Sequence, residues 1–216
     1  MRTAVPSTAT RSSQSSFRLY VEGPRDRGLV ETWAKTRSRD LSRWIARETV
    51  ILGGSQPQRA ADDFARKRAD CVGFGALCLL DRDRGDHALG SCQRDGLEFF
   101  VWPRRHIESY LLVPRAVRRA LRLPPKNRQV EDYFVRQLPG LADEDAFREF
   151  DAKALFGTRG SLAERFGRSI SSGQVARAMR AEELHADVVR LLDLLAEGVG
   201  VGRRPSAVHK PRAQAR

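Results

Sequence analysis

The sequence contains few cysteines and no long hydrophobic run, and each of these shortages argues against a class of protein. Its three cysteines lack the CxxC pattern of structural zinc sites, and a zinc site formed by Cys92 with His87 and His106 has the wrong spacing. No apolar run approaches the roughly 20 residues that cross a bilayer. Residues 1–16 have no apolar segment and are therefore not a secretory signal. We expect a cytoplasmic protein with no membrane partner.

Positive charge, by contrast, is abundant. The formal net charge is +12, and only five of the 39 basic residues are lysines. The two ends, residues 1–16 and 199–216, hold seven basic residues and no acidic one, so the remaining core keeps a net charge of +5. A basic core with a basic tail favours a polyanionic partner, because neutralised phosphates release counterions. Charge alone therefore supports a nucleic-acid partner without distinguishing DNA from RNA.

Hydrophobic patterning changes along the chain. The first half alternates between segments that favour helix, from Pro24 and from about Gln58, and segments that favour strand. The predicted strands are 17–21, 48–52, 72–80 and 97–102. From about residue 105 only helical spacing remains, in segments 105–122, 127–137, 143–156 and 174–197. These segments are punctuated by Pro114, Pro124-Pro125, Pro139-Gly140 and Gly157 to Gly160. Strands that alternate with helices, followed by helices alone, predict an α/β protein with a mainly parallel sheet and a C-terminal helical extension.

This pattern also predicts the division of the chain into domains. The α/β domain spans 17–112 and the extension packed on it spans 113–197. A Ser/Thr-rich, disordered lead-in (1–16) precedes them, and a flexible basic tail (198–216) follows.

Acidic residues occur where three of the predicted strands end. Glu22 closes the first strand, Asp81 and Asp83 close the long apolar one, and Glu108 follows the fourth. Ligands of open α/β sheets bind at the carboxyl ends of the strands, and residues i and i+2 of an extended segment point to the same side. Crowded carboxylates repel one another unless a cation lies between them. Because hard oxygen ligands suit Mg²⁺ or Mn²⁺, the pattern predicts a metal site at this edge.

Four segments taken together carry a more specific signal. They are Val21-Glu22-Gly23-Pro24-Arg25-Asp26, Gly53-Gly54, Leu79-Leu80-Asp81-Arg82-Asp83, and residues 102–112, which end in Ile107-Glu108-Ser109-Tyr110-Leu111-Leu112. They resemble the TOPRIM domain of the overcoming-lysogenisation-defect (OLD) nucleases and their stand-alone relatives, over roughly residues 17–197. Primases and topoisomerases share the EGxxD turn and the DxD strand end. The discriminating motif is IENYLL, in which Ser109 here replaces the usual Asn.

The resemblance implies a TOPRIM-like, Rossmann-like sheet and a metal-dependent endonuclease. Its one or two Mg²⁺ or Mn²⁺ ions would be held by Glu22, Asp26, Asp81, Asp83 and Glu108. In two-metal sites the ions lie ~3.5–4 Å apart and clamp the attacking and leaving oxygens of a phosphodiester. The family also uses a lysine from the helical region near the scissile phosphate. Lys153 matches it best, although it could equally be a solvated helix lysine. Arg105 would either contact phosphate or brace Glu108, so the candidate catalytic residues are Glu22, Lys153 and Arg105.

Larger members of the family carry an ATPase with a GxxxxGK[ST] motif on the same chain, and this sequence has no such motif. The resemblance therefore implies either a separate ATPase partner, as in phage-defence systems, or a nuclease that acts alone. A homodimer through the last apolar helix stays open.

Two other functions stay open. A non-catalytic nucleic-acid-binding or regulatory subunit would still bind DNA or RNA after the five acids are replaced by alanine. A haloacid-dehalogenase-like phosphatase also has a DxD after an apolar strand, but the run from Asp81 to Asp86 lacks the residues that follow it in that family. Hydrolysis of small phosphate esters, trapped by aluminium or beryllium fluoride, would identify such a phosphatase.

Overall fold

The computed structural model describes residues 16–82, 89–140 and 143–201. The predicted lead-in and basic tail fall almost wholly outside these ranges, and so does Asp83. The elements follow in the order β1 (Phe17–Val21), α1 (Pro24–Arg37), α2 (Arg39–Glu48), β2 (Thr49–Ile51), α3 (Pro57–Asp70), β3 (Gly75–Leu80), η1 (Leu89–Cys92), β4 (Leu97–Val101), η2 (Ile107–Leu111), α4 (Pro114–Ala120), α5 (Gln129–Gln137), α6 (Glu144–Phe147), η3 (Ala152–Leu155), α7 (Ser161–Phe166), α8 (Ser172–Ala178), η4 (Ala181–Glu183) and α9 (Ala186–Val199).

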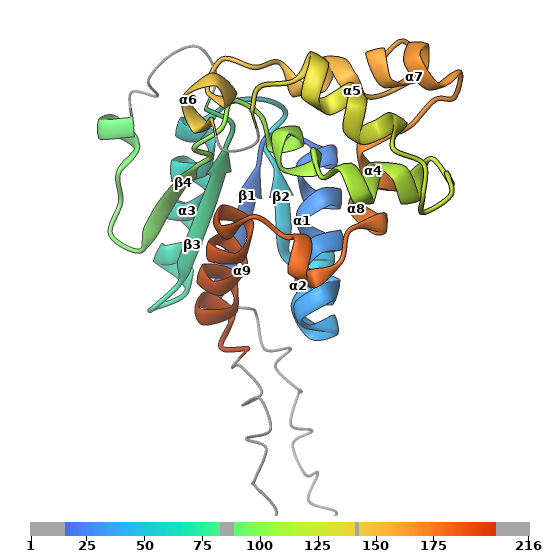
Figure 1. The fold of residues 1–216 in the computed structure, drawn as a ribbon. Helices are drawn as coiled ribbons and strands as arrows, with labels where there is room; N and C mark the ends of the chain where they lie inside the picture. Colours follow the sequence, from blue (N-terminus) through green and yellow to red (C-terminus); the bar gives the residue numbers. More distant parts are fainter. Residues whose placement is uncertain (1–15, 83–88, 141–142, 202–216) are drawn as a thin grey trace, which may run out of the picture.

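The strands β1 to β4 form one sheet in the order β2-β1-β3-β4, and every neighbouring pair is parallel. β3 is an inner strand, and its side chains from Ala76 to Leu80 are all buried, as expected for a strand covered on both faces. Because the strands run in one direction, their carboxyl ends share one edge of the sheet (Figure 1). The acidic residues that are predicted to form a site follow the strands at this edge.

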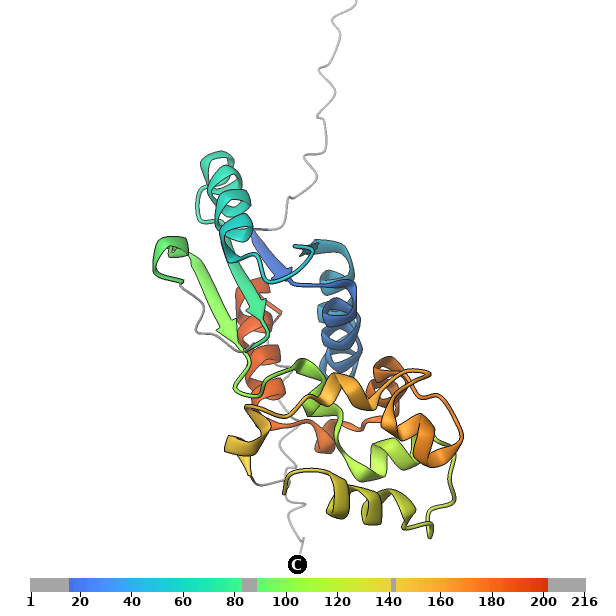
Figure 2. The ribbon, with the colours of Figure 1, turned by 90° about the horizontal axis from the view of Figure 1, so that it is seen from above.

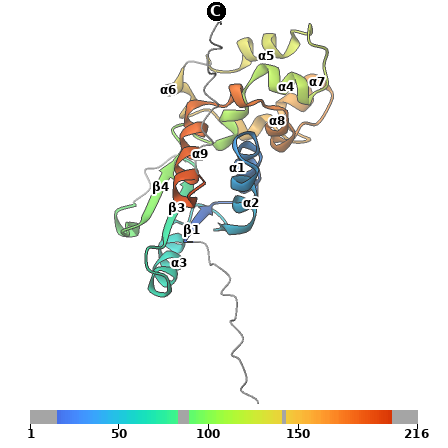
Figure 3. The same cartoon turned by 90° about the horizontal axis from the view of Figure 1, so that it is seen from below.

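Helices cover both faces of the sheet. Successive side chains of a strand point to opposite faces, so Leu19 and Val21 pack with α1, α2 and α9, while Tyr20 packs with α3. Figure 3 shows α3 on one side of the strands and α1, α2 and α9 on the other. Burial of each such leucine or valine contributes about 1.5–3 kcal/mol. The two apolar layers therefore hold the strand ends in a fixed register.

The chain after residue 112 is helical, and α4 to α8 gather beyond the ends toward which the strands point (Figure 2). α8 packs against α1 and α4, and α9 returns to contact β1 and β3. These features confirm the predicted α/β class, the parallel sheet and the helical extension, whereas the domain limits stay a prediction. No helix within the described ranges is long and apolar enough to cross a membrane.

Two predicted segments are shorter or divided. The predicted strand 72–80 begins only at Gly75, because Val72 is fully exposed and Gly73 adopts a φ of +78°. The predicted helix 143–156 is divided into α6 and η3. The side chains of Asp143 and Asp151 accept main-chain hydrogen bonds at the starts of these elements and so begin a new turn each time.

Two further helices are also divided. The segment 105–122 consists of η2 and α4, and α4 begins at Pro114, the residue that punctuates this segment in the sequence. The predicted helix 174–197 consists of α8, η4 and α9. His185 begins α9, because its Nδ1 accepts a hydrogen bond from the amide of Asp187 at 3.2 Å. The six-residue helix α7 was not predicted.

Candidate metal centre at the carboxyl edge of the sheet

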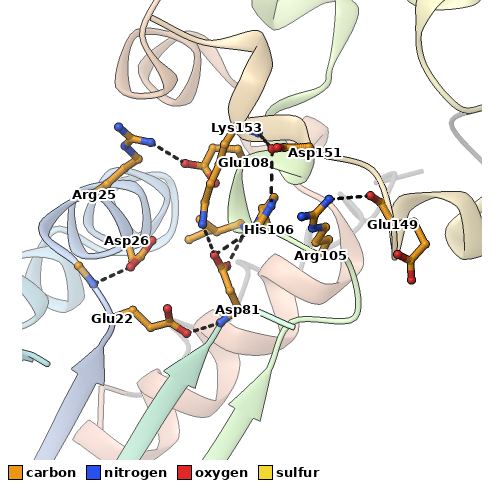
Figure 4. A network of polar contacts seen from close by, with 12 residues as sticks. Glu22, Arg25, Asp26, Asp81, Arg105, His106, Glu108, Glu149, Asp151 and Lys153 are labelled. Atoms are coloured by element: carbon orange, nitrogen blue, oxygen red, sulfur yellow. Dashed lines mark hydrogen bonds and ion pairs between the residues drawn. The ribbon is translucent and has the colours of Figure 1, made fainter. Parts of the chain in front are cut away.

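Glu22 leaves β1 at the sheet edge, beside the end of β3. Its main-chain carbonyl accepts hydrogen bonds from the amides of Gly53 and Gly54, both at 2.9 Å. The two glycines have φ values of +84° and +128°, which side-chain-bearing residues rarely adopt. The Glu22 carboxylate accepts a hydrogen bond from the amide of Asp81 at 2.9 Å. Main-chain geometry thus holds two acids from different strands together (Figure 4).

Asp81 follows β3, is only 6% exposed and connects three segments. Its Oδ1 accepts the main-chain N–H of Ile107 at 3.0 Å, which fixes the turn that carries Glu108. Its Oδ2 accepts a hydrogen bond from Lys153 Nζ at 2.7 Å and lies 3.4 Å from His106 Nδ1. Asp81 is therefore the residue on which the sheet edge and the helical extension converge.

Glu108, in η2, is fully buried. Its Oε1 accepts a hydrogen bond from Arg25 Nη1 at 3.1 Å, but its buried Oε2 has no hydrogen-bond partner among the described residues. A buried ionised carboxylate costs several kcal/mol unless charges or hydrogen bonds compensate it. This oxygen is therefore a candidate ligand for a cation.

Asp26 lies in the first turn of α1 and faces the same acids. Its Oδ2 accepts a hydrogen bond from the amide of Gly23 at 2.7 Å. Burial, followed by the negative charge of Asp81 and a smaller contribution from Glu108, raises the pKa of Asp26 to about 6. Such a shift is expected where carboxylates crowd together with too little positive charge between them.

Lys153 reaches this group of acids from η3. Burial tends to lower the pKa of its ammonium group, but the hydrogen bond to Asp81 and the charges of Asp81, Glu108 and Asp26 outweigh burial and raise it. The ammonium is consequently protonated at neutral pH. Lys153 can supply positive charge here, and it cannot act as a general base without losing that proton.

The structure thus brings four of the five predicted metal ligands to one place, together with the predicted lysine: Glu22, Asp26, Asp81, Glu108 and Lys153. The fifth ligand, Asp83, lies outside the described residues.

Arg105 takes a different position. Its Nη1 donates to the main-chain oxygen of Glu149 at 2.9 Å, and its amide donates to the oxygen of Phe147 at 3.1 Å. Arg105 therefore ties the η2 segment to the chain between α6 and η3, and the arginine that contacts Glu108 is Arg25. A contact of Arg105 with phosphate stays a prediction.

Two residues at the site were not predicted, Arg25 and His106. Arg25 lies within the EGxxD turn, between two predicted ligands, and this position was the signal that could have identified it. His106 is nearly buried, and its Nε2 lies 3.6 Å from Asp151 Oδ1. Cys92 Sγ lies instead 3.4 Å from Gln58 Oε1, in the apolar layer with α3, so it does not join His106 in a zinc site.

The donor set fits a hard divalent cation. Carboxylate oxygens are the ligands that Mg²⁺ and Mn²⁺ prefer. The Glu108 oxygen without a partner in the described part of the chain and the raised pKa of Asp26 both indicate negative charge that is only partly compensated. Within the described part of the chain, no three His, Cys, Asp or Glu side chains are already arranged as ligands of one ion. The nitrogens of Lys153 and Arg25 contact Asp81 and Glu108 instead.

The fold and site define an α/β protein with a carboxylate cluster at the carboxyl edge of a parallel sheet. Neither a protein-family model nor a curated protein sequence matches the chain. The structure is similar to the C-terminal region of the OLD protein of Xanthomonas campestris pv. campestris, with 15% identity and a TM-score of 0.44, over 87% of this chain and 97% of that one. It is also similar to the C-terminal region of the Burkholderia pseudomallei OLD protein, with 14% identity and a TM-score of 0.47, over 86% of this chain and 99% of that one. Both solved structures are from OLD proteins, the group that the sequence motifs resemble. Similarity at this level says nothing about activity, which must be argued from the side chains.

Proposed function

We propose that this protein is a divalent-metal-dependent nuclease that hydrolyses phosphodiester bonds in DNA or RNA. The observation that carries the proposal is the fully buried Glu108, one oxygen of which has no hydrogen-bond partner among the described residues. The charges of Glu108 and Asp81 both act on Asp26 beside them. Crowded carboxylates that are only partly compensated, with a perturbed pKa among them, mark a candidate functional site. Binding of Mg²⁺ or Mn²⁺ is the simplest use of such a site.

The roles of the residues follow from their positions. Glu22, Asp26, Asp81 and Glu108 would hold the metal, with Asp83 as a further candidate. A metal bound there would supply an activated water and charge stabilisation for the departing oxygen. Lys153, protonated and partly exposed, would stabilise negative charge on the phosphate. The net charge of +12 would attract the polyanionic substrate.

The test is to incubate the purified chain with plasmid, single-stranded DNA and total RNA in Mg²⁺ or Mn²⁺. We expect cutting by the wild type and a loss of at least about a hundredfold in Glu22→Gln, in Glu108→Gln and in the double variant Asp81→Asn/Asp83→Asn. Glutamine and asparagine keep side-chain size and remove only the charge that a cation needs.

The matched control is Glu131→Gln. Glu131 on α5 also contacts an arginine, Arg118, and also has a buried oxygen without a partner among the described residues, but it lies in the helical extension. We expect it to cut within about threefold of the wild type, as for a substitution away from the chemistry. Equal cutting by Glu108→Gln and Glu131→Gln would refute the assignment.

The same experiment separates the alternatives. A binding-only subunit would shift nucleic acid with all acids replaced and would show no metal-dependent cutting. A phosphatase of the haloacid-dehalogenase type would hydrolyse small phosphate esters, with Asp81 as nucleophile. The contacts of both Asp81 oxygens, with Ile107 and Lys153, do not favour that role. A separate ATPase partner and a role in defence against phage remain proposals from the resemblance alone.

A further inference from the structure

The ion pair between Arg25 and Glu108 is strongly asymmetric. The Glu108 side chain is fully buried, whereas the Arg25 side chain is 60% exposed. A single contact joins them, from Nη1 to Oε1 at 3.1 Å. A guanidinium can form two parallel hydrogen bonds with a carboxylate, but Oε2 of Glu108 receives none from the described residues. Arg25 thus compensates the buried charge only in part, and from the surface.

In such a pair the arginine can leave its carboxylate for another anion. A mostly exposed guanidinium keeps much of its hydration and loses little when it leaves one anion for another. The buried carboxylate, in contrast, needs a cation wherever the arginine goes. A divalent ion on Glu108 would meet that need better than the single hydrogen bond does.

We propose that Arg25 is a substrate contact whose availability depends on the metal. This inference rests on the proposed nuclease function. In the metal-free protein Arg25 serves as the counter-charge of Glu108. When Glu108 holds a divalent cation, the guanidinium of Arg25 is released and binds a phosphate of the nucleic acid beside the metal centre. Arg25 would thus couple metal loading to substrate binding.

The position of Arg25 agrees with this role. It follows Pro24 at the start of the 14-residue helix α1 and lies between Glu22 and Asp26, so it cannot move far from the metal ligands. Figure 4 shows it at the side of the carboxylate group opposite His106 and Arg105. The helix start adds positive potential for an anion, and the planar guanidinium matches phosphate in a way that lysine does not.

The test measures metal and nucleic-acid binding separately. Mn²⁺ binding by titration calorimetry reports on the ligands. Binding of a fluorescent single-stranded oligonucleotide in Ca²⁺, or in EDTA, reports on the phosphate contact without relying on cleavage. The variants are Arg25→Gln and Arg25→Lys. The control is Arg43→Gln, which removes another exposed arginine that is paired with an acid, Asp40.

We expect Arg25→Gln to weaken binding of the oligonucleotide without weakening binding of Mn²⁺. Arg25→Gln should bind Mn²⁺ as tightly as the wild type or about two- to fivefold tighter, because a competing positive charge is gone. In Ca²⁺ it should bind the oligonucleotide about five- to twentyfold more weakly, with a salt slope reduced by about one, whereas in EDTA its binding should be unchanged. Arg25→Lys keeps the charge and should fold like the wild type, with an intermediate loss of oligonucleotide binding. Arg43→Gln should change neither.

Three results would overturn the proposal. Weaker Mn²⁺ binding by Arg25→Gln would mean that Arg25 merely supports Glu108. Equal losses of oligonucleotide binding in Ca²⁺ and in EDTA would mean that the contact does not depend on the metal. Absence of Mn²⁺ binding by the wild type would reject the metal site itself, and with it the proposed function, so the two failures are distinguishable.

Discussion

Asp26 carries a charge that the metal-free fold stabilises poorly. Its pKa is raised from an ordinary value of 3.8 to about 6, so the folded state binds the proton more tightly than the unfolded chain does. The stability that this proton confers is present at low pH and is lost as the pH rises from about 4 to about 6. Above that range the ionised Asp26 lowers the free energy of unfolding by a constant amount. This penalty is consistent with a residue kept for ligand binding rather than for stability.

Asp26→Asn should remove this penalty while keeping an acceptor for the Gly23 amide. In EDTA at pH 7.5 we expect the variant to be more stable than the wild type by on the order of 1–2 kcal/mol, after allowance for screening by water. At pH 4 the difference should vanish. Urea unfolding across this pH range measures it, and the same substitution at the exposed Asp70 is the control. If the difference in stability between Asp26→Asn and the wild type does not grow between pH 4 and pH 7.5, the carboxylates do not crowd Asp26 as proposed.

At the scale of elements, Arg104 ties the turn that bears Glu108 to α6. Its guanidinium donates to Glu144 at 2.9 and 2.6 Å and to the main-chain oxygen of Ser109 at 3.1 Å, and it lies 4.2 Å from the ring centre of Phe147. Only 5% of the surface of Arg104 is exposed. Few other side chains could form the same set of hydrogen bonds in this position. Its hydrogen bond lowers the pKa of Glu144.

Replacement of Arg104 by Met should therefore destabilise the protein by about 2–4 kcal/mol, since Glu144 and the Ser109 carbonyl lose the nearly buried guanidinium that donates to them and only an apolar stem remains. Arg148→Met is the matched control, because Arg148 pairs with Asp145 on the adjacent turn but is half exposed. It should cost no more than about 0.5 kcal/mol. Guanidinium unfolding measures both. Equal costs for the two variants would show that Arg104 does not organise this junction.

The elements also show which features of the fold the sequence could predict. Alternation and apolar runs predicted the four strands. The acids at the strand ends predicted three of the residues that now lie together, Glu22, Asp81 and Glu108, because parallel strands share one carboxyl edge. Asp26 and Lys153 were expected only from the family resemblance. The interruptions inside the predicted helices 143–156 and 174–197 were missed. Asp143, Asp151 and His185 start new helical segments with their side chains, and a cap looks like any polar residue when the apolar spacing continues across it. The contact of Arg25 with Glu108 could not be predicted, because it depends on how η2 is placed over the sheet.

At the scale of the whole molecule, the proposed metal site joins the sheet edge to the helical extension. Glu22 and Asp81 follow strands, Asp26 lies in the first turn of α1, and Glu108 belongs to η2. Lys153 comes from still further along the chain. A cation bound at this junction would stabilise all these segments in their mutual positions, and metal binding should be visible in the unfolding of the entire chain.

We therefore expect Mn²⁺ at about a hundred times its dissociation constant to raise the free energy of unfolding by about 2.7 kcal/mol. For a protein of this size that corresponds to a rise of roughly 5–10 °C in the melting temperature. Glu108→Gln should lose the rise, and Glu131→Gln should retain it. Each glutamate pairs with an arginine and has one buried oxygen without a partner among the described residues, but only Glu108 lies with Asp26 and Asp81. Thermal unfolding in EDTA and in Mn²⁺ measures the difference. A rise that persists in Glu108→Gln would place the stabilising ion elsewhere and would remove the basis for a metal centre at this edge of the sheet.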